Sequence, residues 1–171
     1  FGSATPSAVQ APSFGASIDL QALDLEEEQL VELGRILYCI GHRFPHLEFI
    51  PILPAIGALL LRVYDPAMTL SCLDAFVKGV HGADEAKDWP FFPHSRRENL
   101  LFSRIFDDLL LKFVPNIHRH VSKLQKDEAS FNPRWNRLLN DFFVGVMPVA
   151  YILRIFDSYV IEGYKVVIRY A

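Results

Sequence analysis

The chain has 171 residues, of which 51% are hydrophobic, and its formal net charge at pH 7 is −3. This length fits one domain with its own core. The charge, with a pI of about 6.1, disfavours nucleic acid as a partner, because such binding needs Lys and Arg clustered on one face. The apolar content is high, so we expect a segment or chain outside this sequence to cover part of the surface.

The two cysteines and the N-terminus bear on the cellular compartment. Cys39 and Cys72 lie in apolar helical patterns and are expected to be small buried thiols in a reducing cytoplasm. The N-terminus lacks the basic region that begins a secretory signal, so no such signal is predicted. The most apolar stretch, 49–61, contains two prolines and is shorter than the roughly 20 residues that a bilayer helix needs. It is therefore predicted to be a buried core segment and not a membrane span.

Residues 1–24 are predicted to be a flexible linker rich in Ala, Ser and Pro, since this composition cannot bury enough surface to offset the entropy lost on ordering. The helical domain is predicted over residues 25–171. Two Phe-Gly pairs, at Phe1 and Phe14, are too few to indicate a function.

The first helix is predicted from Glu26 to Gly41, with three glutamates at its start that cap the helix dipole. Pro45 follows and keeps His42 and His46 off a common helical face, so neither a metal site nor a cofactor is expected. The next helix, 55–64, is apolar almost all round and is therefore expected to be buried on every side. A third helix is predicted from Pro66 to about residue 80.

Ser95 is predicted to cap the helix with the clearest apolar pattern. Its expected core-facing residues are Leu101, Phe102, Ile105, Phe106, Leu109, Leu110 and Phe113. Two arginines in its first turn oppose the helix dipole, which indicates either solvated charge or an anionic partner. The following helix, which starts at about residue 115 and runs to 125, adds a small basic patch. The candidate partner or lipid contacts are Arg96, Arg97, His118, Arg119, His120 and Lys123.

A helix opening at Pro133 and carrying Phe142 and Phe143 precedes the most informative stretch. Pro148 then starts a helix whose expected apolar stripe is Ile152, Ile155, Phe156, Tyr159 and Val160. Arg154 and Asp157 lie one turn apart and are interpreted as a structural ion pair. Gly163 ends this helix, and another begins at about residue 164.

No segment alternates with period two between turn signals, so the chain is predicted to be all-α, with about seven or eight helices and short connections. The sequence also lacks a Gly-rich phosphate loop, a nucleophile elbow and paired zinc cysteines. A self-sufficient enzyme site is therefore not predicted.

Eleven residues near the C-terminus form a recognisable signature, namely Phe131, Pro133, Trp135, Phe142, Pro148, Arg154, Ile155, Phe156, Asp157, Glu162 and Gly163. They resemble the C-terminal pattern of TBC domains, the Rab GTPase-activating domains. The family usually has Trp at the position that Phe156 occupies in this chain. Three earlier segments, 35–37, 44–45 and 55–61, resemble the elements that flank the family's Tyr-Cys-Gln-Gly motif. The resemblance covers about residues 28–171, roughly the C-terminal two thirds of a TBC domain. It implies an orthogonal multi-helix fold that is truncated at its C-terminal helix.

In that family a glutamine and an arginine enter the GTPase in trans, where the glutamine orients water and the arginine offsets phosphoryl charge. The alignment places Pro51 at the glutamine position, and proline has no side-chain amide with which to orient water. The arginine belongs to an Ile-x-x-Asp-x-x-Arg motif that nothing between Phe1 and Arg35 matches. The resemblance therefore implies a domain that lacks the family's catalytic groups.

The proline-bearing segment 44–54 is most similar to the divergent Skywalker-type subfamily, in which a TBC domain is coupled to a TLDc domain. The resemblance implies a catalytically silent module that binds a small GTPase of the Rab or Arf type, or scaffolds other chains, in membrane traffic. Two alternatives stay open: an active Rab GTPase activator with its arginine outside this chain, and a peripheral adaptor on phosphoinositide membranes. The expected location is cytoplasmic, peripheral on a vesicle or plasma membrane, or within a large assembly.

Overall fold

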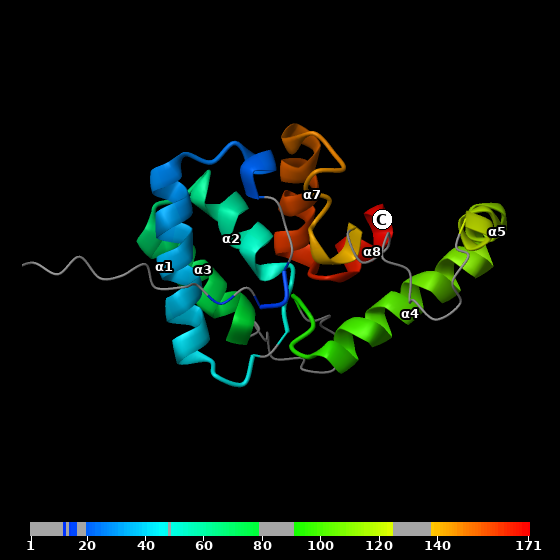
Figure 1. Cartoon of the computed structure of the whole chain (residues 1–171), viewed down its shortest axis with the longest axis horizontal. Helices are drawn as coiled ribbons and strands as arrows, with labels where there is room; N and C mark the ends of the chain where they lie inside the picture. Colours follow the sequence, from blue (N-terminus) through cyan, green and yellow to red (C-terminus); the bar gives the residue numbers. More distant parts are fainter. Residues whose placement is uncertain (1–11, 13, 17–19, 48, 79–90, 125–137) are drawn as a thin grey trace, which may run out of the picture.

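The regular structure in the computed structural model is helical (Figure 1). The structure describes residues 12, 14–16, 20–47, 49–78, 91–124 and 138–171. Within these ranges it contains seven α-helices and one short 3-10 helix, and it has no strand. The predicted all-α class and the predicted number of helices are confirmed.

Helix α2 (Leu53–Leu61) lies at the centre of the first half of the chain, and all nine of its residues are buried. It packs against η1 (Leu20–Leu23), α1 (Glu27–Arg43) and α3 (Pro66–Lys78) (Figure 1). A helix that is apolar on every side needs neighbours on every side, and these three elements supply most of them. The predicted extension to residue 64 is too long, since Val63 and Tyr64 are exposed after the helix ends.

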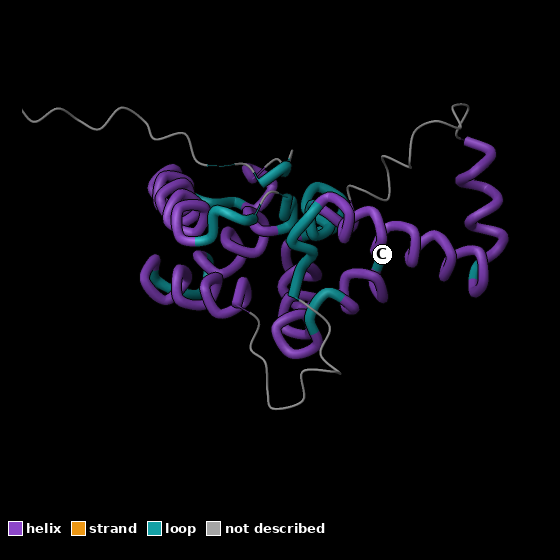
Figure 2. The backbone as a smooth tube through the Cα atoms, turned by 90° about the horizontal axis from the view of Figure 1, so that it is seen from below, coloured by secondary structure: helices purple, strands orange, loops and turns teal. Residues whose placement is uncertain are grey.

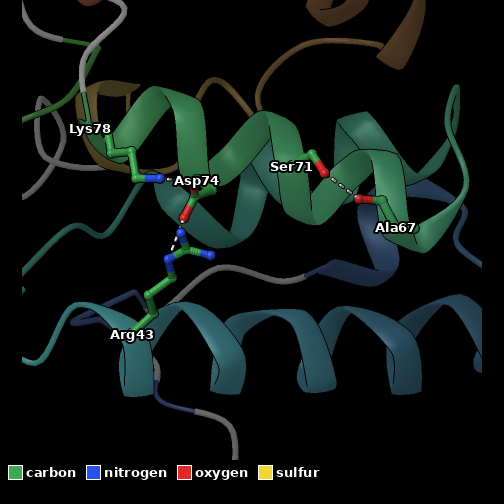
Figure 3. Close-up of polar contacts among 5 residues, drawn as sticks. All are labelled: Arg43, Ala67, Ser71, Asp74 and Lys78. Carbon is green, nitrogen blue, oxygen red and sulfur yellow. Dashed lines mark hydrogen bonds and ion pairs between the residues drawn. The ribbon is translucent and has the colours of Figure 1, made fainter.

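An ion pair joins the end of α1 to α3 (Figure 3). Arg43 Nε lies 2.8 Å from Asp74 Oδ1, and Lys78 Nζ, one turn further along α3, lies 2.5 Å from Asp74 Oδ2. The Asp74 side chain is only 16% exposed, so its two cationic partners offset the loss of water around the carboxylate. This contact holds α1 and α3 together on one side of α2.

Helices α7 (Val149–Glu162) and α8 (Lys165–Tyr170) form the C-terminal corner of the fold. Four of the five predicted stripe residues of α7 are buried, whereas Val160 is 40% exposed. Gly163 links the two helices with φ +71° and ψ −157°, a conformation that is accessible essentially only to glycine. Two buried tyrosines secure the corner: Tyr159 donates to the Phe91 carbonyl, and Tyr164 donates to the Leu139 carbonyl at 3.2 Å. Burial raises the pKa of both hydroxyls, which keeps them protonated as donors.

The prediction that one helix continues through Phe143 is wrong. Phe142 and Phe143 have φ values of +49° and +63° in a turn, and both side chains are fully buried. A left-handed backbone costs such a residue about 1–3 kcal/mol, and burying a Phe ring returns about 1.5–3 kcal/mol. The Phe142 ring also packs edge-on against Tyr159 with centroids 5.2 Å apart, so core packing stabilises the turn. Residues 131–137, with the expected helix start, lie outside the described residues.

Helices α4 (Arg96–Phe113) and α5 (Pro115–Leu124) form an arm that leaves the rest of the fold (Figures 1 and 2). The Ser95 side chain caps α4 as predicted, accepting from the Glu98 amide at 3.2 Å. The expected core-facing role is wrong for Leu101, Leu109 and Phe113, which are 56%, 36% and 68% exposed. Periodicity identifies an apolar face but does not identify what covers it.

Part of the expected linker 1–24 belongs to the core. Phe14 is 5% exposed and Leu23 is fully buried, so the predicted boundary at residue 24 is wrong for these positions. Cys39 is exposed and Cys72 is half-buried, which corrects the expectation of two buried thiols. Among the helices that the structure describes, none has the length and apolar content needed to cross a bilayer.

Candidate functional site

Pro51, the residue at the predicted glutamine position, lies in the turn that leads into α2. The turn is closed by the Leu53 amide, which donates to the Ile50 carbonyl at 3.0 Å. Pro51 is buried, and its neighbours Ile50 and Ile52 are 0% exposed. This position therefore has neither a side-chain amide nor access to a partner protein.

The N-terminal segment supports this turn from outside. The Ile50 amide donates to the Phe14 carbonyl at 2.9 Å, and Gly15 follows with φ +81°. A Cβ on Gly15 would lie 2.3 Å from Cε2 of Phe49, so the close approach requires glycine. The sequence analysis assigned no function to the Phe-Gly pair at Phe14 and did not predict this contact.

Arg96 lies over the half-buried ring of Phe49, with its guanidinium carbon 5.3 Å from the ring centroid. An exposed cation–π contact contributes about 0.5–1 kcal/mol, which offsets the unfavourable helix dipole at the start of α4. Arg97 is exposed beside it. The contact explains why a cation is accommodated at this helix terminus.

Two histidines complete this surface. The His94 amide donates to Glu98 Oε2 at 2.7 Å. Burial lowers the pKa of the His94 side chain, Glu98 partly opposes that shift, and His46 adds to it, so His94 is neutral at pH 7. We call the exposed and half-buried residues around Pro51 the Phe49 surface, and its members are His46, Phe49, His94 and Arg96.

The structure does not bring the six predicted cationic contacts together. Two of them begin α4, and the other four lie on α5 beyond its far end, so a helix of 18 residues, about 27 Å long, separates the groups. The two groups are therefore separate candidate contacts. The residues concerned are Arg96 and Arg97 in the first group and His118, Arg119, His120 and Lys123 in the second. His118 is also partly used within the arm, where its Nε2 lies 3.4 Å from Asp107 Oδ1.

Arg154 and Asp157 are both exposed, and the described residues show no ion pair between them. The interpretation as a structural ion pair is wrong, because both side chains lie on the solvent side of α7. Glu162 has the structural role instead: Arg169 donates to its two carboxylate oxygens at 2.9 and 2.7 Å. These hydrogen bonds, with Lys165 at 3.3 Å, lower the pKa of Glu162 to about 2. Glu162 thus fastens α8 to the end of α7.

The described residues contain no group of three His, Cys, Asp or Glu side chains placed to hold a metal ion. His42 stacks on Tyr38 at a centroid distance of 6.4 Å, and His46 lies in the following turn. The Phe49 surface presents aromatic, cationic and imidazole groups, of which Arg96 lies at the start of α4 and the others lie in turns and loops.

Residues 17–171 match the family model of the Rab-GTPase-TBC domain, and the chain belongs to this family. It is 27% identical to TBC1 domain family member 24 of Xenopus laevis over 171 residues, which make up 99% of this chain and 29% of that protein. It is 25% identical to TBC1 domain family member 2A of Bos taurus over 141 residues, 82% of this chain and 14% of that protein. The chain therefore spans less than a third of these curated relatives.

The fold is similar to the crystal structure of the TBC domain of Skywalker/TBC1D24 from Drosophila melanogaster in complex with inositol(1,4,5)triphosphate. The TM-score is 0.75 with 18% identity, over 94% of this chain and 54% of that chain. At this identity the likeness establishes the fold. Together with the family match and the first relative, it confirms a TBC domain of the Skywalker type.

Proposed function

We propose that this TBC domain binds a small GTPase of the Rab type and does not accelerate its GTP hydrolysis. The observation that carries the proposal is buried Pro51 at the position of the family's glutamine. A group that orients water in trans must project from its domain and must both donate and accept hydrogen bonds. Pro51 meets neither requirement.

The Phe49 surface is the proposed anchor for the GTPase. Aromatic and arginine side chains are enriched among the residues that dominate binding energy, and here Phe49 and Arg96 are already stacked before binding. This preorganisation reduces the side-chain entropy lost on association. Neutral His94 and exposed His46 beside them offer polar contacts at the edge of the same surface.

The test separates binding from catalysis with a panel of GTP-loaded Rab and Arf proteins. We expect at least one to bind the domain in biolayer interferometry while phosphate release stays at its intrinsic rate. Arg96→Ala should weaken that binding by about 1 kcal/mol or more. The control is Arg97→Ala, which removes an equal charge from the same helical turn without a contact to Phe49.

Two results would overturn this proposal. One is a rise in GTP turnover of several orders of magnitude, which is the effect of a true activator. The other is an equal loss of GTPase affinity in Arg96→Ala and Arg97→Ala, which would show that the binding site lies elsewhere. An activator with its arginine outside this chain would show its activity only when a longer protein containing that arginine is assayed.

Phosphoinositide membranes are the second candidate partner, because the similar Skywalker domain was crystallised with an inositol trisphosphate. In this chain Arg96 and Arg97 offer two exposed cations at one end of α4. Flotation with phosphatidylcholine vesicles, with and without a phosphoinositide, tests this candidate. Dependence on the lipid that is lost in the Arg96→Ala, Arg97→Ala double variant supports it, and binding that ignores the lipid excludes it.

A further inference from the structure

Three described residues early in the chain, Pro12, Phe14 and Gly15, lie against the helical domain, and we call them the strap. The Phe14 carbonyl accepts a hydrogen bond from the Ile50 amide, and Gly15 lies against the ring of Phe49. The strap therefore covers part of the Phe49 surface. We propose that it gates this surface: the strap is closed over Phe49 in the free domain and must leave before a GTPase binds there. This inference rests on the function proposed above.

The closed strap has a fitted seat on α1. The Phe14 side chain is 5% exposed. A Cβ on Gly41 would lie 3.0 Å from Cγ of Pro12 and 3.4 Å from Cζ of Phe14. The absence of a side chain at Gly41 therefore leaves the space in which the two rings of the strap pack. The hydrogen bond from the Ile50 amide, at 2.9 Å, fixes the strap to the turn before α2.

The strap and a protein partner would compete for the same side of Phe49. A Cβ on Gly15 would overlap the Cδ2–Cε2 edge of the Phe49 ring, so the backbone of the strap covers this edge directly. Arg96 lies over the same ring, and Phe49 is left half-buried. An aromatic side chain contributes most to binding when the partner removes it from water completely. A GTPase that buries Phe49 in this way has to displace Gly15.

The backbone of the strap opposes its own closure. Phe14 has φ +49° and Gly15 has φ +81°, so both adopt the left-handed conformation. Glycine adopts it without strain, but a residue with a Cβ does not. The burial of the Phe14 ring favours the closed strap, whereas this strain disfavours it. Because the two contributions are opposite in sign, opening of the strap costs less free energy than unfolding of the helices beneath it.

A disulfide can lock the strap in its closed position. A Cβ on Gly41 would lie 3.8 Å from Cβ of Pro12, which is the separation typical of a disulfide. The variant combines Pro12→Cys with Gly41→Cys, and Cys39→Ala removes the exposed thiol nearby. The same intact chain is then compared in its oxidised, locked form and after reduction with dithiothreitol. The control is the chain with Cys39→Ala alone, which should respond to neither treatment.

Binding to the GTP-loaded Rab panel is measured by biolayer interferometry. We expect reduction of the locked chain to raise its affinity by about tenfold or more, because apparent affinity increases with the fraction of molecules in the binding-competent state. Phe14→Ala in the otherwise unchanged chain should also raise the affinity, since it removes the ring that holds the strap closed. Circular dichroism verifies that each variant is folded.

Hydrogen exchange of the Ile50 amide, measured by NMR, follows the strap without any GTPase. This amide donates to Phe14 in the closed strap, so the lock should slow its exchange relative to the reduced form. Slower exchange in the locked form, with no GTPase bound by any form, would support an opening strap and overturn the proposed function. The two proposals can therefore fail separately.

Three results would overturn the gate. Equal GTPase affinity in the locked and reduced forms would show that the closed strap does not block the partner. Equal exchange of the Ile50 amide in the two forms would show that the strap does not open. Weaker GTPase binding by a folded Phe14→Ala variant would show that the strap is part of the binding surface instead of a cover over it.

Discussion

Helix α2 and the arm of α4 and α5 are both rich in apolar residues, yet they differ in what surrounds them. All nine residues of α2 are buried, whereas in α4 only four of 18 are, at positions 99, 102, 103 and 106. Three neighbouring elements cover α2, while Leu109, Leu111 and Phe113 in the outer part of α4 are exposed. Apolar content therefore indicates a surface that is favourable to bury, but it does not indicate whether the chain itself or a partner buries it.

The largest expected effect compares one leucine from each region. Leu59→Ala in α2 should lower the free energy of unfolding by about 2–5 kcal/mol, because Leu59 is fully buried and its removal leaves a cavity. Leu111→Ala in α4 should change it by less than about 0.5 kcal/mol, because Leu111 is 55% exposed. Urea unfolding monitored by circular dichroism gives both values. Similar losses in the two variants would show that the arm is covered in solution.

A second prediction concerns the corner between α7 and α8, where Gly163 links the two helices. Gly163→Ala should cost about 1–3 kcal/mol of unfolding free energy, since φ +71° with ψ −157° is strained for any residue with a Cβ. Unchanged stability would mean that the corner relaxes into another conformation at little cost.

The third prediction uses the pH dependence of stability to test how Glu162 fastens α8 to the end of α7. Its pKa is lowered from 4.5 to about 2 in the folded chain, so the unfolded chain takes up the proton first as pH falls. The stabilisation by Glu162 is therefore complete above about pH 4.5 and is lost progressively as the pH falls towards 2. We expect wild type to be more stable than Glu162→Gln at pH 7. The gap between them should close at low pH in unfolding curves, and a gap independent of pH would contradict this assignment.

The smallest effect is expected for Arg154 and Asp157, the two exposed charged residues of the signature in α7. Arg154→Ala and Asp157→Ala should each change the unfolding free energy by less than about 0.5 kcal/mol, since both side chains are exposed. A double-mutant cycle should give a coupling energy near zero. A coupling energy of about 1 kcal/mol or more would show that Arg154 and Asp157 form the ion pair that the sequence pattern indicated.

One part of the candidate site could be predicted from the sequence, and the other part could not. The assignment of Pro51 to the glutamine position is a prediction from the resemblance, in which the Phe-Pro turn and the apolar helix after it align the motif. The contact of Arg96 with Phe49 could not be predicted, since 46 intervening residues carry no signal of their pairing. The same holds for the docking of Phe14 on Ile50.

The sequence alone predicts where several helices start and end and which helix is buried on every side. The Ser95 cap, the Pro148 start and the turn at Gly163 depend on residues within one helical turn, so local chemistry is sufficient. The tertiary structure was needed to show that Leu109, Leu111 and Phe113 of α4 are exposed and that Phe142 and Phe143 lie in a turn. These outcomes depend on packing between segments far apart in the chain, which local periodicity does not encode.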